Sequence, residues 1–237
     1  MSTRRSVGRS NTNLTTFQNF YQGWLVRQEH YLEELRSVLQ DSNEFEVDQL
    51  RDLINRVFIH YQEYYEEKSR IANHDVLLVF CPPWYSAFER SFFWIAGVKP
   101  GLAFRIIRSS VDDLSQEQVD KIEILKAETR AEEKEIGDEL ARIQESVAAP
   151  PIVEVMKKFA MDECTDGDEA MDAFKVELEV VLANADMLRT RTAERVVDVL
   201  APLQSLKFFA ALTEFQMKLR TWGAKLSQCG LDNVLES

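Results

Sequence analysis

Residues 84–100 read WYSAFERSFFWIAGVKP, a stretch in which aromatic side chains predominate. Within residues 84–96 only Glu89 and Arg90 carry charge. A helix that is apolar on almost every side is buried in a protein core. The stretch therefore predicts a short aromatic helix over residues 84–96, placed at the centre of the fold and closed by Gly97.

The segments on either side of this stretch predict long amphipathic helices. Apolar residues recur every three or four positions, which places them on one face of a helix, and no segment alternates as a strand does. Capping-box spacing at Thr15 with Gln18 and at Ser115 with Gln118 marks two helix starts, and Pro202 ends or kinks another helix. We expect helices over residues 15–39, 47–79, 102–107, 116–147, 151–161, 168–199 and 203–226.

These elements predict an all-α fold, a single multi-helix bundle of long amphipathic helices around the short aromatic helix. Hydrophobic residues make up 45% of the chain, enough for a sizeable core. Eight glycines and six prolines are too few for the many turns of a β-sandwich. We expect a disordered arm at residues 1–13, the helical domain at 14–228 and a tail at 229–237.

The charge and the apolar runs restrict the partners and the compartment. The formal net charge is −12, with 28 Lys and Arg against 40 Asp and Glu, and nucleic-acid affinity comes mainly from basic side chains. The longest apolar runs, at residues 76–81 and 92–98, are far shorter than the ~20 residues that span a bilayer. The N-terminus does not resemble a secretory signal. We expect a protein of the nucleus, the cytoplasm or both, with no membrane association.

No sequence motif of an enzyme or a metal site occurs. The chain contains no HExxH, no Walker loop, no GxGxxG and no GxSxG. No glutamate stands three residues before His30, His60 or His74, so the Glu-x-x-His pair of di-iron bundles is absent. The run Glu132–Glu135 is interpreted as solvated surface. We predict a protein that is not an enzyme and has no catalytic residues and no metal.

The two charges inside the aromatic stretch allow two interpretations. Glu89 and Arg90 are costly in an apolar segment unless they are paired. They can form buried ion pairs with other helices, or they can anchor a ligand or a partner. The aromatic side chains could also stack on nucleic-acid bases, but such surfaces need interleaved basic residues, and only Arg90 is present.

Several ordered motifs resemble the plant Delay of Germination family, whose domain also forms the C-terminal half of TGA-type leucine-zipper transcription factors. They are the stretch at 84–100, Leu114-Ser115 with Gln118, and Ala185–Arg189 followed by Thr192. The resemblance extends from Phe17 to Trp222. The basic region and zipper of the TGA factors are missing, so the chain resembles the stand-alone class. The family-motif residues, offered as an interaction site, are Trp84, Glu89, Arg90, Trp94, Gly97, Pro100, Asp186 and Arg189.

The resemblance implies a regulatory role in seed maturation, dormancy and abscisic-acid signalling. It implies protein partners, with protein phosphatases or bZIP factors as candidates, and the TGA members bring an association with sequence-specific DNA binding. Some relatives are linked to haem through two histidines in the last helix, whereas residues 215–222 contain no histidine, so we expect no haem and no other cofactor. An apolar small-ligand sensor is an alternative function, and a homo-oligomer remains open.

Overall fold

The computed structural model describes residues 3–41, 45–146 and 167–228. Within these ranges it contains helices and no β-strand, apart from one isolated bridge between Phe93 and Val98. The prediction of an all-α fold is therefore confirmed. The helices are α1 (Thr3–Gln40), α2 (Val47–Ala72), α3 (Val76–Phe80), α4 (Ala87–Arg90), α5 (Leu102–Ser110), α6 (Gln116–Ser146), α8 (Gly167–Val199) and α9 (Pro202–Gln228).

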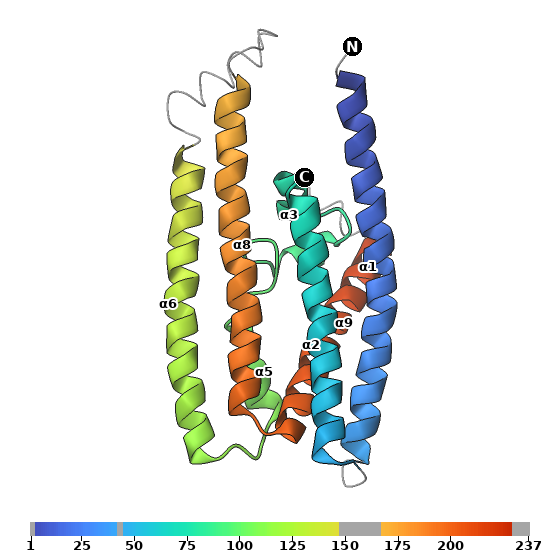
Figure 1. Ribbon diagram of the computed structural model, residues 1–237, viewed down its shortest axis with the longest axis vertical. Coiled ribbons are helices and arrows are strands. Elements are labelled where there is room, and N and C mark those ends of the chain that lie inside the picture. The colour runs from blue at the N-terminus through green and yellow to red at the C-terminus, as the bar shows by residue number, and fades with distance from the viewer. Residues whose placement is uncertain (1–2, 42–44, 147–166, 229–237) are drawn as a thin grey trace.

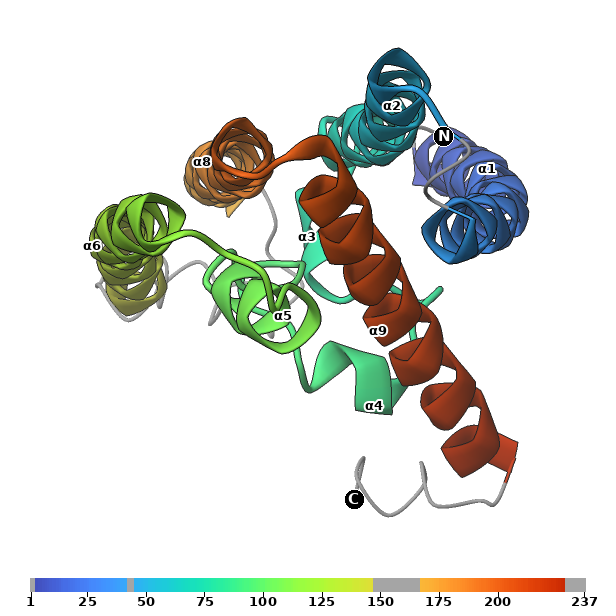
Figure 2. The same cartoon turned by 90° about the horizontal axis from the view of Figure 1, so that it is seen from below.

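The long helices α1, α2, α6 and α8 run along the molecule, and α9 crosses them (Figure 1). Seen from below, α6, α8, α2 and α1 stand in a curved row, and α9 runs along one side of this row together with α5 and α4 (Figure 2). Helix α9 contacts α1 and α2, while α8 contacts α2 and α6, so both halves of the chain share one set of contacts. The single domain over residues 14–228 stays a prediction.

Among the residues that the structure describes, the buried hydrophobic side chains form two clusters. One joins α1, α2, α5 and α9 around residues such as Leu35, Val57 and Phe208. The other joins α1, α3, α8 and residues 84–96, and it includes Phe17, Trp84 and Val181. The apolar faces predicted from the 3–4 spacing thus meet one another.

Helix α1 begins earlier than the sequence indicates. It starts at Thr3 and not at Thr15, so the predicted cap at Thr15 is wrong and residues 3–13 form the first turns of the helix instead of an arm. Residues 3–14 contain no proline, and the helix continues through them. By contrast, α6 starts as predicted, because the Ser115 and Gln118 side chains each accept the other residue's backbone N–H, at 3.2 and 3.0 Å.

The helix predicted over residues 47–79 is interrupted. Helix α2 ends at Ala72, and α3 begins at Val76 after the N-cap residue Asp75. The Asp75 carboxylate accepts the N–H of Leu78 at 3.2 Å, which starts a new helix where the apolar periodicity alone suggested continuation.

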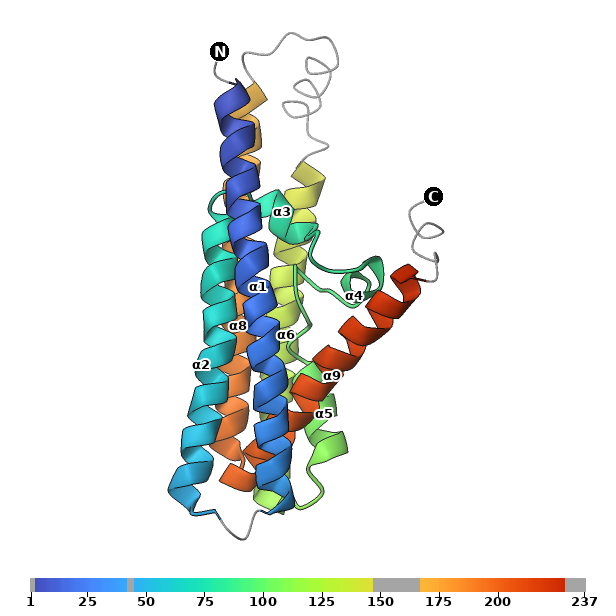
Figure 3. The same ribbon diagram turned by 90° about the vertical axis from the view of Figure 1, so that its right-hand side faces the viewer.

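The aromatic stretch is not the predicted central helix. Only residues 87–90 are helical, as α4, and α4 lies beside the outer part of α9, not on the bundle axis (Figure 3). Beyond α4 the backbone turns back on itself, because the Trp94 N–H bonds the Gly97 carbonyl at 2.7 Å. A segment rich in apolar side chains can be buried as a turn as well as a helix, and composition does not distinguish the two.

Two predictions lie outside the described residues. They are the helix over residues 151–161 and the tail at 229–237.

Candidate functional site

Two of the sequence motifs come together where a tight turn rests against α8. Residues 93–98 form the turn, in which Ile95 and Ala96 have positive φ angles of 47° and 55°. Positive φ is costly for side chains other than glycine. Such a turn persists only when the surrounding structure holds it, and here one side chain of α8 does so.

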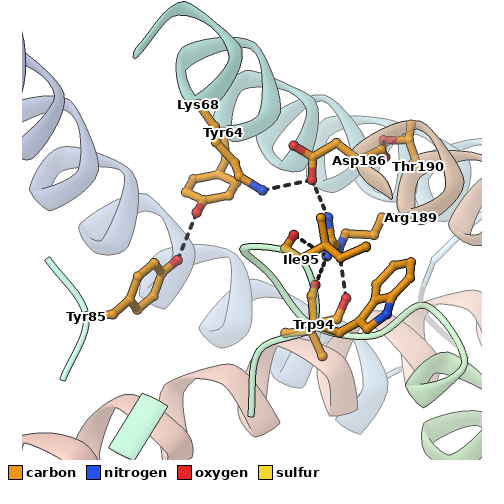
Figure 4. Close-up of polar contacts among 9 residues, drawn as sticks. Tyr64, Lys68, Tyr85, Trp94, Ile95, Asp186, Arg189 and Thr190 are labelled. Carbon is orange, nitrogen blue, oxygen red and sulfur yellow. Dashed lines mark hydrogen bonds and ion pairs between the residues drawn. The ribbon is translucent and has the colours of Figure 1, made fainter. Parts of the chain in front are cut away.

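Arg189 binds the turn through three backbone carbonyls (Figure 4). Its Nε donates to Val98 O at 2.8 Å, and its Nη2 donates to Ile95 O at 2.9 Å and to Trp94 O. The guanidinium also lies 5.5 Å from the centre of the Trp94 ring. A Cβ at Gly97 would stand 2.9 Å from Arg189 Cζ. Only glycine therefore lets the guanidinium come this close to the backbone. We call this arrangement the Arg189 clamp.

Asp186 connects the Arg189 clamp to α2. Its Oδ1 accepts from Arg189 Nη1 at 2.5 Å and from Lys68 Nζ at 2.9 Å. The Lys68 side chain is only 1% exposed. Burial lowers the pKa of Lys68 from 10.5 to about 8, although the charge of Asp186 acts in the opposite direction. The cluster of Lys68, Asp186 and Arg189 thus fastens α2, α8 and the turn to one another.

A pair of tyrosines links α2 to the start of the aromatic stretch. The hydroxyl oxygens of Tyr64 and Tyr85 are 3.0 Å apart (Figure 4). Burial raises the pKa of both phenols well above the ordinary value of 10. Both are therefore neutral at physiological pH and can share one hydrogen bond.

The structure brings some of the predicted site residues together and separates others. Trp94, Gly97 and Arg189 belong to the Arg189 clamp, and Asp186 contacts it. Pro100 lines a cavity beside the clamp, together with Arg189. Trp84 lies elsewhere and packs against Phe17 of α1, with the ring centres 4.4 Å apart.

Glu89 and Arg90 point to different neighbours. The Glu89 carboxylate accepts the Ser86 N–H and hydroxyl, each at 2.8 Å, and lies 3.6 Å from Arg220 Nη1 of α9. Arg90 Nη1 donates to Tyr85 O at 3.1 Å. Glu89 thus caps α4 and pairs with a residue of α9. This agrees with the first of the two interpretations, a buried ion pair with another helix.

Sequence reasoning missed two charged core residues. Lys68 occupies the apolar face of α2, between Tyr64 and Ile71. A lysine at such a position could have been recognised from the sequence as a buried charge. Glu133 is 5% exposed, so the interpretation of Glu132–Glu135 as solvated surface is wrong at this residue. Its carboxylate accepts the Gly101 N–H at 2.6 Å and thereby caps α5.

A buried histidine completes the polar interior. The His60 ring stacks on Trp24 with 4.6 Å between ring centres, and its Nε2 lies 2.7 Å from Gln28 Oε1. Its Nδ1 is buried and has no hydrogen-bond partner. Burial, followed by the charge of Arg27, lowers the pKa of His60 from 6.5 to about 4.

This pKa predicts a loss of stability in acid. Below pH 6.5 the unfolded chain binds a proton at His60, whereas the folded chain does so only near pH 4. Stability therefore falls as the pH decreases through this interval, by about 3 kcal/mol from this residue. Urea unfolding of the wild type and of His60→Gln at pH 7 and pH 4.5 measures the effect. The variant should lose less stability between the two pH values, and an equal loss in both proteins would contradict the assignment.

The cluster of Lys68, Asp186 and Arg189 has a structural role, since it joins parts of the protein to one another. The Asp186 carboxylate and the Arg189 guanidinium bind other protein groups. Among the residues that the structure describes, no group of three or more His, Cys, Asp or Glu could hold a metal ion. No described helix is long and apolar enough to cross a membrane.

Comparison with known proteins gives the class to which this domain belongs. A family model described as seed dormancy control matches residues 31–109. Protein ZW2 of Arabidopsis thaliana is 34% identical over 216 residues, which cover 88% of this chain and 96% of that protein. Protein RESPONSE TO ABA AND SALT 1, from the same plant, is 33% identical over 86% of this chain and 94% of its own length.

The chain therefore belongs to the DOG1-like family of plant regulatory proteins. The same domain occurs in a class of transcription factors. Transcription factor TGA7 of Arabidopsis thaliana is 26% identical over 225 residues, which cover 92% of this chain and 59% of that factor.

Proposed function

We propose that this protein regulates abscisic-acid-linked signalling in seed maturation and dormancy by binding other proteins, without catalysis and without haem or another cofactor. The similarity to a relative named for its response to ABA and salt supports the signalling role. A place in the nucleus, the cytoplasm or both is part of the proposal.

The observation that carries this proposal is an exposed aromatic patch formed by Phe88, Phe92 and Trp222. Phe92 is 45% exposed and Trp222 is 55% exposed. Their rings lie edge to face with Phe88, with centre distances of 5.1 and 6.4 Å. Exposed, rigidly held Trp and Phe side chains are typical of protein interfaces.

The charge around the aromatic patch indicates the kind of partner. Residues 216–228 of α9 carry Lys218, Arg220 and Lys225 and no acidic residue, in a chain whose net charge is −12. Lys218 lies 2.7 Å from Glu214 and Arg220 lies 3.6 Å from Glu89, so Lys225 is the cation of this stretch that is offered to a partner. An apolar protein segment flanked by acidic residues is complementary to it.

Affinity capture from an extract of maturing seeds tests this function. The tagged chain is incubated with nuclease-treated extract, and bound proteins are identified by mass spectrometry. We expect signalling proteins such as phosphatases to be recovered with the wild type and to fall about tenfold or more with Trp222→Ala, because exposed tryptophans often dominate binding energy.

The matched control is Ile124→Ala on α6. Ile124 is 60% exposed but lies on a different helix. The Ile124→Ala variant should capture the same proteins, in the same amounts, as the wild type. Equal losses with both variants, or no loss with Trp222→Ala, would exclude the aromatic patch as the interface.

A second candidate is transcription regulation through a bZIP partner. The match of 92% of this chain to a TGA factor favours it. The net charge of −12 disfavours direct phosphate contacts, so a bZIP protein would supply the DNA contact. Recovery of only bZIP factors from the nuclease-treated extract would support this candidate over the first.

A further inference from the structure

A cavity next to the Arg189 clamp is the feature that the proposed function does not use. Its volume is about 100 Å³, and it lies between α2, α5, α8 and α9. The walls are largely apolar and include Phe58, Leu102, Phe208 and Leu212. Lys99 also lines the cavity and is 54% exposed, so the cavity reaches the surface at this residue.

One residue that lines this cavity has a buried polar atom without a partner. Thr192 lines the cavity and is 2% exposed, and its Oγ1 has no hydrogen-bond partner. Leaving a buried hydroxyl without a partner costs free energy, and native proteins rarely do so without a reason. Thr213 illustrates the usual arrangement, since its buried hydroxyl lies 3.0 Å from the Tyr61 hydroxyl. A ligand that reaches Thr192 would supply the missing partner.

We propose that this cavity binds a small, uncharged, largely apolar molecule whose single hydroxyl or carbonyl oxygen forms a hydrogen bond with Thr192. The ligand carries no charge, because the two cations that line the cavity already have acidic partners. Lys99 Nζ is 3.5 Å from Glu133, and Arg189 Nη1 is 2.5 Å from Asp186. The cavity is therefore electrostatically balanced before a ligand enters.

The cavity of about 100 Å³ is by itself smaller than a site for one substituted ring, which also needs the space beside it. Apolar cavities of about 150 Å³ bind benzene. A neighbouring cavity of about 90 Å³ shares Tyr61, Tyr65, Val98 and Gln216 with the first one, so small side-chain movements could enlarge the site. Because Val98, Pro100 and Arg189 line the cavity, a bound ligand would also support the Arg189 clamp.

The first test is the thermal stability of Thr192→Val, in which the side chain keeps its shape but loses the hydroxyl. Removing an unsatisfied buried hydroxyl should raise the melting temperature of the ligand-free protein by about 2–4 °C. The same exchange at Thr213 should lower it, because the hydrogen bond between the Thr213 and Tyr61 hydroxyls is lost. A lower melting temperature for Thr192→Val would overturn the proposal, since the hydroxyl would then have a partner within the protein.

The second test compares two probes of similar size, benzyl alcohol and toluene, by NMR titration of the full chain. Both should perturb the methyl signals of Leu102 and Leu212. The ratio of the benzyl alcohol Kd to the toluene Kd should rise about tenfold in Thr192→Val and stay unchanged in Thr213→Val.

Two results of the titration would overturn the proposal. One is the absence of saturable shifts with either probe, which would mean that the cavity holds only water or is closed. The other is binding with the same ratio in the wild type and in Thr192→Val. Neither result depends on a protein partner, so the cavity site and the proposed function can fail independently.

Discussion

Arg189→Met is expected to lower the free energy of unfolding by about 3–5 kcal/mol. The substitution removes the donor to the carbonyls of Trp94, Ile95 and Val98. It also removes one cation that contacts the Asp186 carboxylate, so that Lys68 remains. The turn with positive φ angles loses the side chain that holds it. Urea unfolding followed by circular dichroism measures the loss.

Two variants separate the clamp from a general effect of charge. Arg189→Lys keeps the charge but cannot reach three carbonyls and a carboxylate at once, so an intermediate loss is expected. Arg191→Met removes a 43% exposed arginine of α8 that pairs with Glu132 of α6, and its cost should stay below about 1 kcal/mol. Similar losses at Arg189 and Arg191 would show that the carbonyl contacts contribute little.

Gly223→Ala is expected to destabilise the protein by about 1–3 kcal/mol, although alanine is usually better than glycine inside a helix by about 0.5–1 kcal/mol. A Cβ at this position of α9 would stand 2.1 Å from the Ser86 hydroxyl oxygen and 3.1 Å from Ser86 Cβ. Ser86 cannot turn away without cost, because its hydroxyl caps α4. Helix α4 would have to move away from α9, and Glu89 would separate from Arg220.

Gly137→Ala provides the matched control for this substitution. The nearest atom to its added Cβ would be Trp94 Nε1 at 3.9 Å, an ordinary contact. Gly137→Ala should therefore stabilise α6 by about 0.5–1 kcal/mol. Combining Gly223→Ala with Ser86→Ala should cost less than the sum of the two single variants, because the hydroxyl clash is removed. A gain in stability from Gly223→Ala alone would mean that α4 approaches α9 less closely than described.

The long helices could be predicted from the sequence because their apolar spacing repeats over many turns. The start of α6 at Gln116 and the break before Pro202 followed from local rules for capping and for proline. The stretch at 84–96 could not be predicted in this way. Its turn depends on positive φ angles at Ile95 and Ala96, which are held by a residue of another helix and leave no local signal in the sequence.

Only part of the candidate site could be predicted from the sequence, for a similar reason. Asp186 and Arg189 were found through a resemblance to known motifs, and spacing could not reveal that they contact residues 94–98. Lys68 and Glu133 occupy positions on apolar helix faces, where a charge is unexpected, and this could have marked them as buried partners.

The Arg189 clamp also constrains the order of events during synthesis. Arg189 Nε bonds Val98 O across 91 positions of sequence, and at 5–20 residues per second the ribosome needs about 5–20 s to add that many residues. During synthesis the turn therefore lacks its contacts with Arg189 until most of the chain has been translated. The region matched by the family model, residues 31–109, contains the turn but not its arginine. That region by itself lacks the side chain that holds the turn, and α8, which is translated later, supplies it.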